Sequence, residues 1–317
     1  MHLQQSLSAL RTAIPYIRAY KGRVFVVKLG GQLCVPGRAL DNVVDQLGLL
    51  YQLGIQLVVV HGGGPQATAM TQRLGLTPQV FAGRRITDAA VLEVAKMTFA
   101  GTLNTDLVAA LQAVHVPAVG LSGIDAGTIS ARKRPVQTVN DPSSGEVREI
   151  DFGFVGDIGE VRPELLRQLL ASGYVPVVCS LAADERGQVL NVNADTVATR
   201  IAVALGAAKY FLITNVDGVL RDIKDSTSLL PYLDLAQLDE LIAGGAISGG
   251  MLPKLTACID ALRGGVPRVH IINGGTPDSL LGEVFTNEGC GTLLVSQRNG
   301  RSNGEASATA ATTGANA

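Results

Sequence analysis

Apolar residues near the start of the chain repeat every three or four positions, at Leu3, Leu7, Leu10, Ile14 and Ile17. This spacing predicts an amphipathic helix over residues 1–22 with one apolar stripe. Because proline removes a backbone donor and crowds the preceding turn, the helix should bend at residue 15. The stripe could pack on its own domain or pair with another subunit. Its place before the first strand favours an oligomerisation helix.

Beyond residue 22, short apolar runs alternate with helical patterns. Strands are expected over residues 23–29, 56–61, 116–121, 175–180, 210–214, 268–273 and 292–295. Helices are expected over residues 39–53, 88–111, 162–172, 194–205, 235–243 and 254–263. Another helix is expected to begin at residue 65. Turn-rich residues 127–155 predict hairpins. This order predicts an α/β fold whose mainly parallel sheet carries helices on both faces.

Composition narrows the class of protein. Hydrophobic residues make up 47% of the 317 positions and charged residues 17%, which predicts a large buried core. The net charge of −1 and the absence of tryptophan argue against a nucleic-acid partner. No apolar run is long enough to span a membrane. Residues 298–317, rich in Ser, Asn, Gly, Ala and Thr, predict a disordered tail, and no second domain is expected after residue 297.

Cysteine usage and the N-terminus bear on location. The four cysteines are isolated, which favours core positions in a reducing compartment and a cytoplasmic protein; they are Cys34, Cys179, Cys258 and Cys290. A mitochondrial presequence is the alternative, because no acidic residue precedes Asp41. A core strand beginning by Val24 leaves little room for such a leader.

Three glycine-rich turns carry the first candidate chemistry, at residues 28–31, 61–65 and 249–254, each after a strand-like segment. Exposed backbone N–H groups at such turns bind phosphate or carboxylate oxygens. One such turn would be an ordinary tight loop. Three of them, two with a lysine (Lys28 and Lys254), favour a phosphate-handling site.

Two polar motifs precede predicted helices. In the motif at 191–196, Asn191 and Asn193 could hold polar groups of a substrate, while Asp195 could hold lysine ammonium groups. A helix cap alone would need fewer polar groups. In the motif at 83–88, Arg85 is either a surface charge or a planar two-point ligand for a substrate carboxylate.

Taken together and in order, these motifs resemble those of the acetylglutamate kinases in the amino-acid kinase family. The matching segments are VVKLGG at 26–31, HGGGPQ at 61–66, GRRITD at 83–88, NVNADT at 191–196, GGMLPK at 249–254 and EVFTNEGCGT at 283–292. The resemblance implies an open αβα sandwich. It also implies a lobe over 23–180 for the acyl amino acid and a lobe over 181–297 for the nucleotide.

The resemblance also implies roles for individual residues. Lys28 and Lys254 would stabilise the transferring phosphoryl group, and Asp195 would orient both lysines. Substrate-binding positions would be Gly63, Gly64, Arg85, Asn191 and Asn193, and nucleotide-binding positions Gly30, Gly31, Thr214, Asp217 and Met251. The implied reaction is ATP-dependent phosphorylation of the side-chain carboxylate of N-acetyl-L-glutamate in arginine biosynthesis. Mg²⁺ would be bound with the nucleotide, and the chain would have no metal site of its own.

The N-terminal helix and residues 283–292 resemble the arginine-inhibited branch, which is hexameric. The implied arginine-binding residues are Tyr16, Glu283, Gly289 and Gly291. Two departures favour the alternative of an unregulated dimer: Asn273-Gly274-Gly275 replaces Asp-Gly-Arg, and Asp278 replaces His. A third, Asn215 in place of a common Asp, bears on the nucleotide or metal contact. Either way, a homo-oligomer acting on small molecules is expected.

Two other functions remain open from the sequence. A related kinase could act on an aminoadipate derivative, with altered contacts around Arg85 and Asn191. A non-catalytic amino-acid sensor could keep only the arginine site. The presence of Lys28, Asp195 and Lys254 together argues against a sensor.

Overall fold

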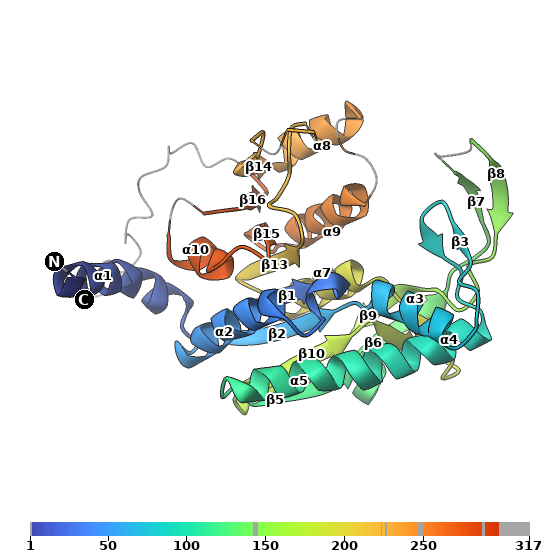
Figure 1. Ribbon diagram of the computed structural model, residues 1–317, viewed down its shortest axis with the longest axis horizontal. Helices are drawn as coiled ribbons and strands as arrows, with labels where there is room; N and C mark the ends of the chain where they lie inside the picture. Colours follow the sequence, from blue (N-terminus) through green and yellow to red (C-terminus); the bar gives the residue numbers. More distant parts are fainter. Residues whose placement is uncertain are drawn as a thin grey trace, which may run out of the picture.

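The computed structural model describes residues 2–141, 145–222, 224–225, 227–245, 247, 250–286 and 289–297, with side chains from residue 11 (Figure 1). The predicted tail at 298–317 lies outside this part of the chain. No helix among the described residues is long and apolar enough to cross a membrane.

A central sheet of eight strands runs in the order β14-β16-β15-β13-β1-β2-β10-β5. The strands are β1 (Val24–Leu29), β2 (Gln56–His61), β5 (Ala118–Ser122), β10 (Val175–Cys179), β13 (Lys209–Thr214), β14 (Tyr232–Asp234), β15 (Val269–Asn273) and β16 (Thr292–Val295). All neighbouring pairs from β5 to β15 are parallel, and β16 is antiparallel to β15. The predicted mainly parallel sheet is therefore confirmed.

Helices cover both faces of this sheet (Figure 1). One layer contains α2 (Arg38–Gln52), α3 (Gly64–Arg73), α4 (Ala89–Lys96), α5 (Asn104–Ala113) and α10 (Ser279–Phe285). The other contains α6 (Glu164–Ala171), α7 (Ala194–Leu205), α8 (Leu235–Ala243) and α9 (Met251–Arg263). Alternate residues of each strand enter the two cores: Val27 of β1 faces α2, whereas Val26 faces α7 and α9. The predicted αβα sandwich is confirmed.

A smaller sheet, β12-β11-β6-β9, lies beside the carboxyl end of β10. Its strands are β6 (Ile129–Lys133), β9 (Gly156–Val161), β11 (Leu181–Ala183) and β12 (Val189–Asn191). The expected hairpin forms from β7 (Gln137–Asn140) and β8 (Val147–Ile150), at the right of Figure 1. The two-lobe division at 180/181 stays a prediction; β11, just after it, pairs with β6.

Several local predictions were wrong or incomplete. The long helix expected over 88–111 contains a π-helical segment, Met97–Leu103, between α4 and α5. Of the third glycine-rich segment, residues 251–254 form the start of α9, and the preceding element in the described part of the chain is α8 rather than a strand. The sequence reading missed short elements held by tertiary contacts: β3 (Val80–Phe81), β4 (Arg84–Arg85), β11, β12, β14, α10, and the 3-10 turns at Gly31–Leu33 and Asp125–Gly127.

The N-terminal helix α1 (His2–Tyr20) is confirmed and packs against α10, at the left of Figure 1. Pro15 lies inside it. Of the predicted stripe, Ile14 is 36% exposed, and the side chains of Leu3, Leu7 and Leu10 lie outside the described part.

The prediction that all four cysteines fill the core was right for three of them. Cys34, Cys179 and Cys258 are buried, but Cys290 is exposed. It lies in the loop after α10, where its backbone N–H donates to Glu283 and its side chain remains partly open to solvent.

Candidate active site

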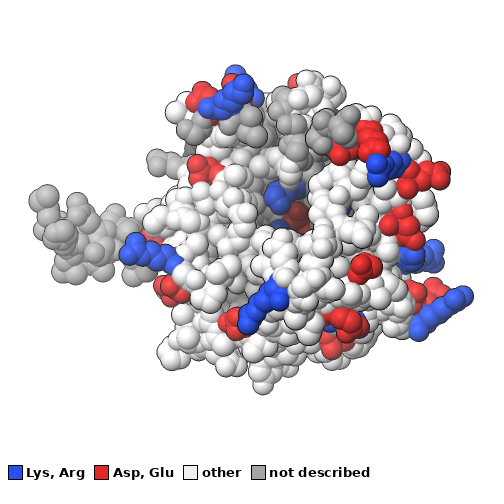
Figure 2. All heavy atoms as spheres, turned by 45° about the vertical axis from the view of Figure 1, so that its right-hand side comes forward, with Lys and Arg blue, Asp and Glu red and all other residues white. Residues whose placement is uncertain are grey.

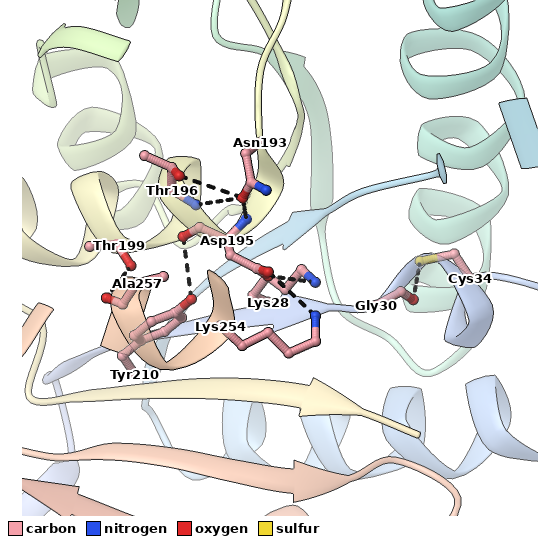
Figure 3. Close-up of polar contacts among 10 residues, drawn as sticks. All are labelled: Lys28, Gly30, Cys34, Asn193, Asp195, Thr196, Thr199, Tyr210, Lys254 and Ala257. Atoms are coloured by element: carbon pink, nitrogen blue, oxygen red, sulfur yellow. Dashed lines mark hydrogen bonds and ion pairs between the residues drawn. The ribbon is translucent and has the colours of Figure 1, made fainter. Parts of the chain in front are cut away.

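The site begins with a buried ion pair between β1 and α7. Lys28 is the fifth residue of β1 and points to the same side of the sheet as Val26, toward α7. Asp195 lies in the first turn of α7. Lys28 Nζ is 2.7 Å from Asp195 Oδ1, and both side chains are less than one-tenth exposed (Figure 3). This pair lies at the carboxyl end of β1, where ligands bind in open parallel sheets.

A second lysine completes the cluster. Lys254, near the start of α9, brings its Nζ within 3.4 Å of Asp195 Oδ2, so the carboxylate joins two ammonium groups from different elements (Figure 3). Burial alone would raise the pKa of Asp195, but the charges of Lys28 and then Lys254 outweigh it and lower that pKa. Asp195 is therefore ionised at neutral pH. Its carboxylate contacts the ammonium groups of both lysines.

Asn193 and Asn191 lie immediately before this cluster. Asn193 Oδ1 caps α7 by accepting hydrogen bonds from the N–H groups of Asp195 (2.8 Å) and Thr196 (3.1 Å). Asn191 Nδ2 donates to Thr87 Oγ1 at 3.2 Å. The motifs at 83–88 and 191–196 therefore meet in space.

Arg85 reaches the glycine turn that follows β2. Its Nη2 donates to the carbonyl oxygen of Gly64 and to Thr68 Oγ1, both in α3. Partial burial lowers the pKa of the guanidinium. Arg85 is thus held beside Gly63 and Gly64. This partly buried position does not fit the interpretation that Arg85 is only a solvent-exposed surface charge.

The turn after β1 lies against the turn after β2. Gln66 Nε2 donates to the carbonyl oxygen of Gly31. A Cβ atom at Gly31 would lie 3.1 Å from both Gln66 Oε1 and Pro65 Cδ, so a side chain there would crowd this contact. Gly30 is fixed from the other side, because its N–H donates to Ile213 of β13.

The predicted nucleotide positions lie at the carboxyl ends of β13 and β15, on the same edge of the sheet as Lys28. Thr214 Oγ1 bonds to both the N–H and the carbonyl oxygen of Val216, which shapes the turn after β13. Asp217 accepts a hydrogen bond from Asn273 Nδ2 at 2.8 Å. Met251 begins α9, three residues before Lys254. Gly30 lies beside Thr214, because a Cβ atom at Gly30 would be 4.0 Å from the Thr214 Cα.

The predicted arginine-binding residues lie elsewhere, around α10. The carboxylate of Glu283 is buried and pairs with His270 Nδ1 at 2.7 Å. It also accepts hydrogen bonds from the N–H groups of Cys290 and Gly291. Burial would raise the pKa of Glu283, but these partners, His270 first, lower it to about 2. This carboxylate already organises the loop at 289–291, and α1, which carries Tyr16, packs on the same helix.

A cleft of about 1370 Å³ has Arg85, Asn191, Asn193, Leu252 and Thr256 among its lining residues. Lys28, Asp195 and Lys254 do not line it, although Asn193 and Pro253, which do, lie within two residues of Asp195 and Lys254 in the chain. Figure 2 shows a hollow in one face of the molecule, with basic and acidic groups at its bottom. Charges of both signs are scattered over the rest of that face (Figure 2).

Comparison with known proteins now identifies the family. The profile of the amino acid kinase family matches residues 23–273, which contain Lys28, Asp195 and Lys254. The chain belongs to the amino acid kinase family.

Relatives of this amino acid kinase cover most of its length. The acetylglutamate kinase of Myxococcus xanthus (strain DK1622) is 47% identical over 91% of this chain and 94% of its own. That of Methanocorpusculum labreanum (strain ATCC 43576 / DSM 4855 / Z) is 42% identical over 91% of this chain and 96% of its own.

Solved structures show the same fold. The N-acetylglutamate synthase of Neisseria gonorrhoeae, complexed with coenzyme A and N-acetyl-glutamate, superposes with a TM-score of 0.78 at 30% identity. The match covers 92% of this chain and 63% of the synthase, so the chain spans about two-thirds of that longer protein. A complex of the same synthase with coenzyme A and L-arginine gives a TM-score of 0.76 at 27% identity, over 92% of this chain and 65% of the synthase.

The sequence analysis did not predict a role for two buried side chains near these sites. His61 and Asn104 lie under the turn at 62–64 and bond to each other. The signal for His61 was its place directly before three glycines. Asn104 had no such signal, because it lay within what read as an uninterrupted helix.

Proposed function

We propose that this amino acid kinase transfers the γ-phosphoryl group of ATP to the side-chain carboxylate of N-acetyl-L-glutamate, a step of arginine biosynthesis. The main support for the proposal is that the carboxylate of Asp195 forms ion pairs with both Lys28 and Lys254. In addition, Arg85 is hydrogen-bonded to the glycine turn after β2. Acetylglutamate kinases that are 41–47% identical over about nine-tenths of the chain support the acceptor.

The mechanism follows from the charges. The acceptor carboxylate has an ordinary pKa near 4.3, so it is ionised at neutral pH and needs no general base. One of its oxygens forms a bond to the γ-phosphorus while the bond from that phosphorus to the β,γ-bridging oxygen breaks, which releases ADP and the acyl phosphate. Because two anions must meet, catalysis depends on positioning and on neutralising charge. Lys28 and Lys254 supply that positive charge, and Asp195 keeps their ammonium groups together.

The substrates would approach from the two halves of the site. Arg85 and the N–H groups of Gly63 and Gly64 would bind the acyl amino acid, together with Asn191 and Asn193. Gly30, Gly31, Thr214, Asp217 and Met251 would bind ATP, which enters as its Mg²⁺ complex. Among the described residues, no three His, Cys, Asp or Glu side chains form a group that could hold a metal.

We further propose that arginine regulates the enzyme, that the chain forms a homo-oligomer, and that the protein is cytoplasmic. The synthase complex with L-arginine and the packing of α1 on α10 support an arginine site beside α1. The apolar stripe of α1 supports pairing of two dimers through this helix, and hence a hexamer built from three dimers. Free thiols at all four cysteines support a cytoplasmic location.

The test of the proposed function is an ATP-dependent hydroxamate assay, which traps acyl phosphates directly. N-acetyl-L-glutamate, glutamate, aspartate and an N-acylated aminoadipate should be compared at equal concentration. The proposal expects product chiefly from N-acetyl-L-glutamate. Preference for the aminoadipate derivative would transfer the function to the related kinase, and no product from any acceptor would favour a sensor.

A further inference from the structure

The peptide between Gly62 and Gly63 is held from beneath by a buried histidine. His61 ends β2 and is fully buried. Its Nδ1 lies 3.0 Å from the carbonyl oxygen of Gly62, and its Nε2 lies 3.0 Å from Asn104 Nδ2. A carbonyl oxygen can only accept, so the ring hydrogen must be on Nδ1.

The second contact fixes the same tautomer independently. Asn104 Nδ2 also donates to the carbonyl oxygen of Val177 at 2.9 Å, which identifies it as the amide nitrogen. Its second hydrogen therefore points to His61 Nε2, which must accept. Burial lowers the pKa of His61 to about 4, so the neutral ring that both contacts require persists at neutral pH.

The orientation of the His61 ring determines the direction in which the Gly63 N–H points. A trans peptide is planar, and its C=O and N–H groups point in opposite directions. All described peptide bonds are trans. Because Nδ1–H of His61 holds the Gly62 carbonyl toward the core, the N–H of Gly63 must point away from the core. Gly63 is also the residue before the first turn of α3, where N–H groups have no partner within the helix.

The π-helical segment positions the other side chains that contact the glycine turn or His61. Phe99 and Leu103 press directly on Gly63: a Cβ atom there would lie 2.4 Å from Leu103 Cδ1 and 2.7 Å from Phe99 Cδ1. Asn104 follows as the first residue of α5. It has room only because residue 120 is glycine, where a Cβ atom would lie 2.0 Å from Asn104 Oδ1.

We propose that His61 and Asn104 are positioning residues, which aim the Gly63 N–H at the acyl amino acid by fixing the Gly62–Gly63 peptide. The inference rests on the proposed function for the identity of that ligand. The histidine touches no substrate, and it acts through the peptide that it holds.

Two substitutions at one position separate positioning from packing. In His61→Asn, the amide nitrogen can take the place of Nδ1 and still donate to Gly62. In His61→Gln, the amide instead reaches the place of Nε2, and the bond to Gly62 is lost. We expect His61→Gln to raise KM for N-acetyl-L-glutamate about tenfold, the usual effect of one hydrogen bond, with KM for ATP changed less than about twofold. His61→Asn should recover most of that loss.

Two further variants test the network without changing His61. Gly120→Ala should displace Asn104 and raise KM for N-acetyl-L-glutamate by roughly threefold. Thr71→Val is the matched control, because it removes a buried hydroxyl of α3 that bonds only within that helix. It should lower Tm and leave both KM values unchanged. Equal losses in His61→Asn and His61→Gln, or parallel rises in both KM values, would assign His61 to packing and overturn the proposal.

A measurement on the unsubstituted protein needs no substrate. Nitrogen-15 NMR of the histidine rings should show His61 protonated at Nδ1 and not at Nε2 at neutral pH. A hydrogen on Nε2 would overturn the proposal even if the kinase activity is confirmed. If the enzyme instead prefers another carboxylate, the proposed function fails, while the tautomer and the KM for that carboxylate still test the role of His61.

Discussion

The central sheet has one buried lysine at the carboxyl ends of its strands, here called the carboxyl edge, and another at their amino ends, the amino edge. The surroundings of these two lysines differ. At the carboxyl edge, Lys28 and Lys254 share the carboxylate of Asp195. At the amino edge, Lys209 begins β13, is 2% exposed, and donates to the backbone carbonyl of Glu283 at 2.8 Å. Its ammonium also lies over the rings of Tyr20 and Phe211.

This difference separates the lysines for which we propose a role in chemistry from a lysine that packs inside the fold. Burial, followed by repulsion from Arg268, lowers the pKa of Lys209 to about 7 despite the opposite effect of Glu283. At the carboxyl edge, both lysines instead contact the carboxylate of Asp195, whose pKa they lower. The first cluster lies at the proposed substrate site and Lys209 lies against α1 and α10, so substitutions at the two edges should have different consequences.

The largest expected effect is at the carboxyl edge. Lys28→Ala or Lys254→Ala should lower kcat by about 10²–10³-fold, because each lysine stabilises charge that develops as the phosphoryl group moves. KM for N-acetyl-L-glutamate should rise much less. Steady-state kinetics at saturating ATP would measure this split. Near-normal kcat in either variant would remove that lysine from the mechanism.

A smaller effect is expected at the acyl-amino-acid half of the site. Arg85→Lys should raise KM for N-acetyl-L-glutamate about tenfold, because an ammonium cannot reproduce the planar, two-point contact of a guanidinium with a carboxylate. KM for ATP should stay within about twofold of the wild-type value. Arg84→Lys, at the exposed neighbouring position, is the matched control. An unchanged KM in Arg85→Lys would argue against carboxylate binding.

At the amino edge, the expected effect is on stability and its pH dependence. The pKa of Lys209 is about 7 in the folded protein and near 10.4 when unfolded, so between these values the unfolded chain binds the additional proton. The free energy of unfolding therefore rises with pH across this window. Lys209→Met removes that contribution, so its Tm relative to wild type should fall by roughly 2–4 °C between about pH 6.5 and about pH 9.5.

Lys21→Met, at an exposed position, is the control for this stability experiment. It should show no comparable pH dependence. A constant difference in Tm between Lys209→Met and wild type at both pH values would show that Lys209 keeps the same charge in the folded and unfolded states.

The smallest expected effect on catalysis is from the N-terminal arm. Deleting residues 1–13 leaves Tyr16 and Tyr20, whose ring packs on Phe25. Activity should stay within about twofold, while a hexamer should become dimers and arginine inhibition should weaken. Light scattering and an arginine titration would measure both. A full-length protein that is already a dimer, insensitive to arginine, would assign the chain to the unregulated branch.

The sequence was most informative where local pattern and burial agree. The strand at 56–61 and the helices at 194–205 and 235–243 were predicted with the observed bounds, because an apolar period and clear turn residues delimit each one. The segments that carry Lys28, Asp195 and Arg85 were likewise found from their motifs. That Asp195 would hold lysine ammonium groups was expected from the residue types, but its contact with Lys28 of β1 could be expected only from the resemblance, since spacing along the chain does not encode it.

The elements that the sequence did not predict depend on tertiary contacts. The short helix α10 is held by Gln46 of α2, whose Oε1 accepts hydrogen bonds from the N–H groups of Leu280 and Leu281. The π-helical segment reads as an ordinary helix, because the register change that brings Phe99 and Leu103 against Gly63 leaves no distinct apolar period. For the same reason, the support of Asn104 for His61 became visible only in the fold.

The central claim is that Asp195 orders two lysines for phosphoryl transfer, and Asp195→Asn tests it most directly. Rapid-quench measurement of acyl phosphate from enzyme saturated with ATP and N-acetyl-L-glutamate would isolate the chemical step. The account predicts a rate lowered by about 10²-fold or more, with KM for both substrates within about threefold of wild type. A chemical step at the wild-type rate would contradict it, because the lysines would then not need the carboxylate that joins them.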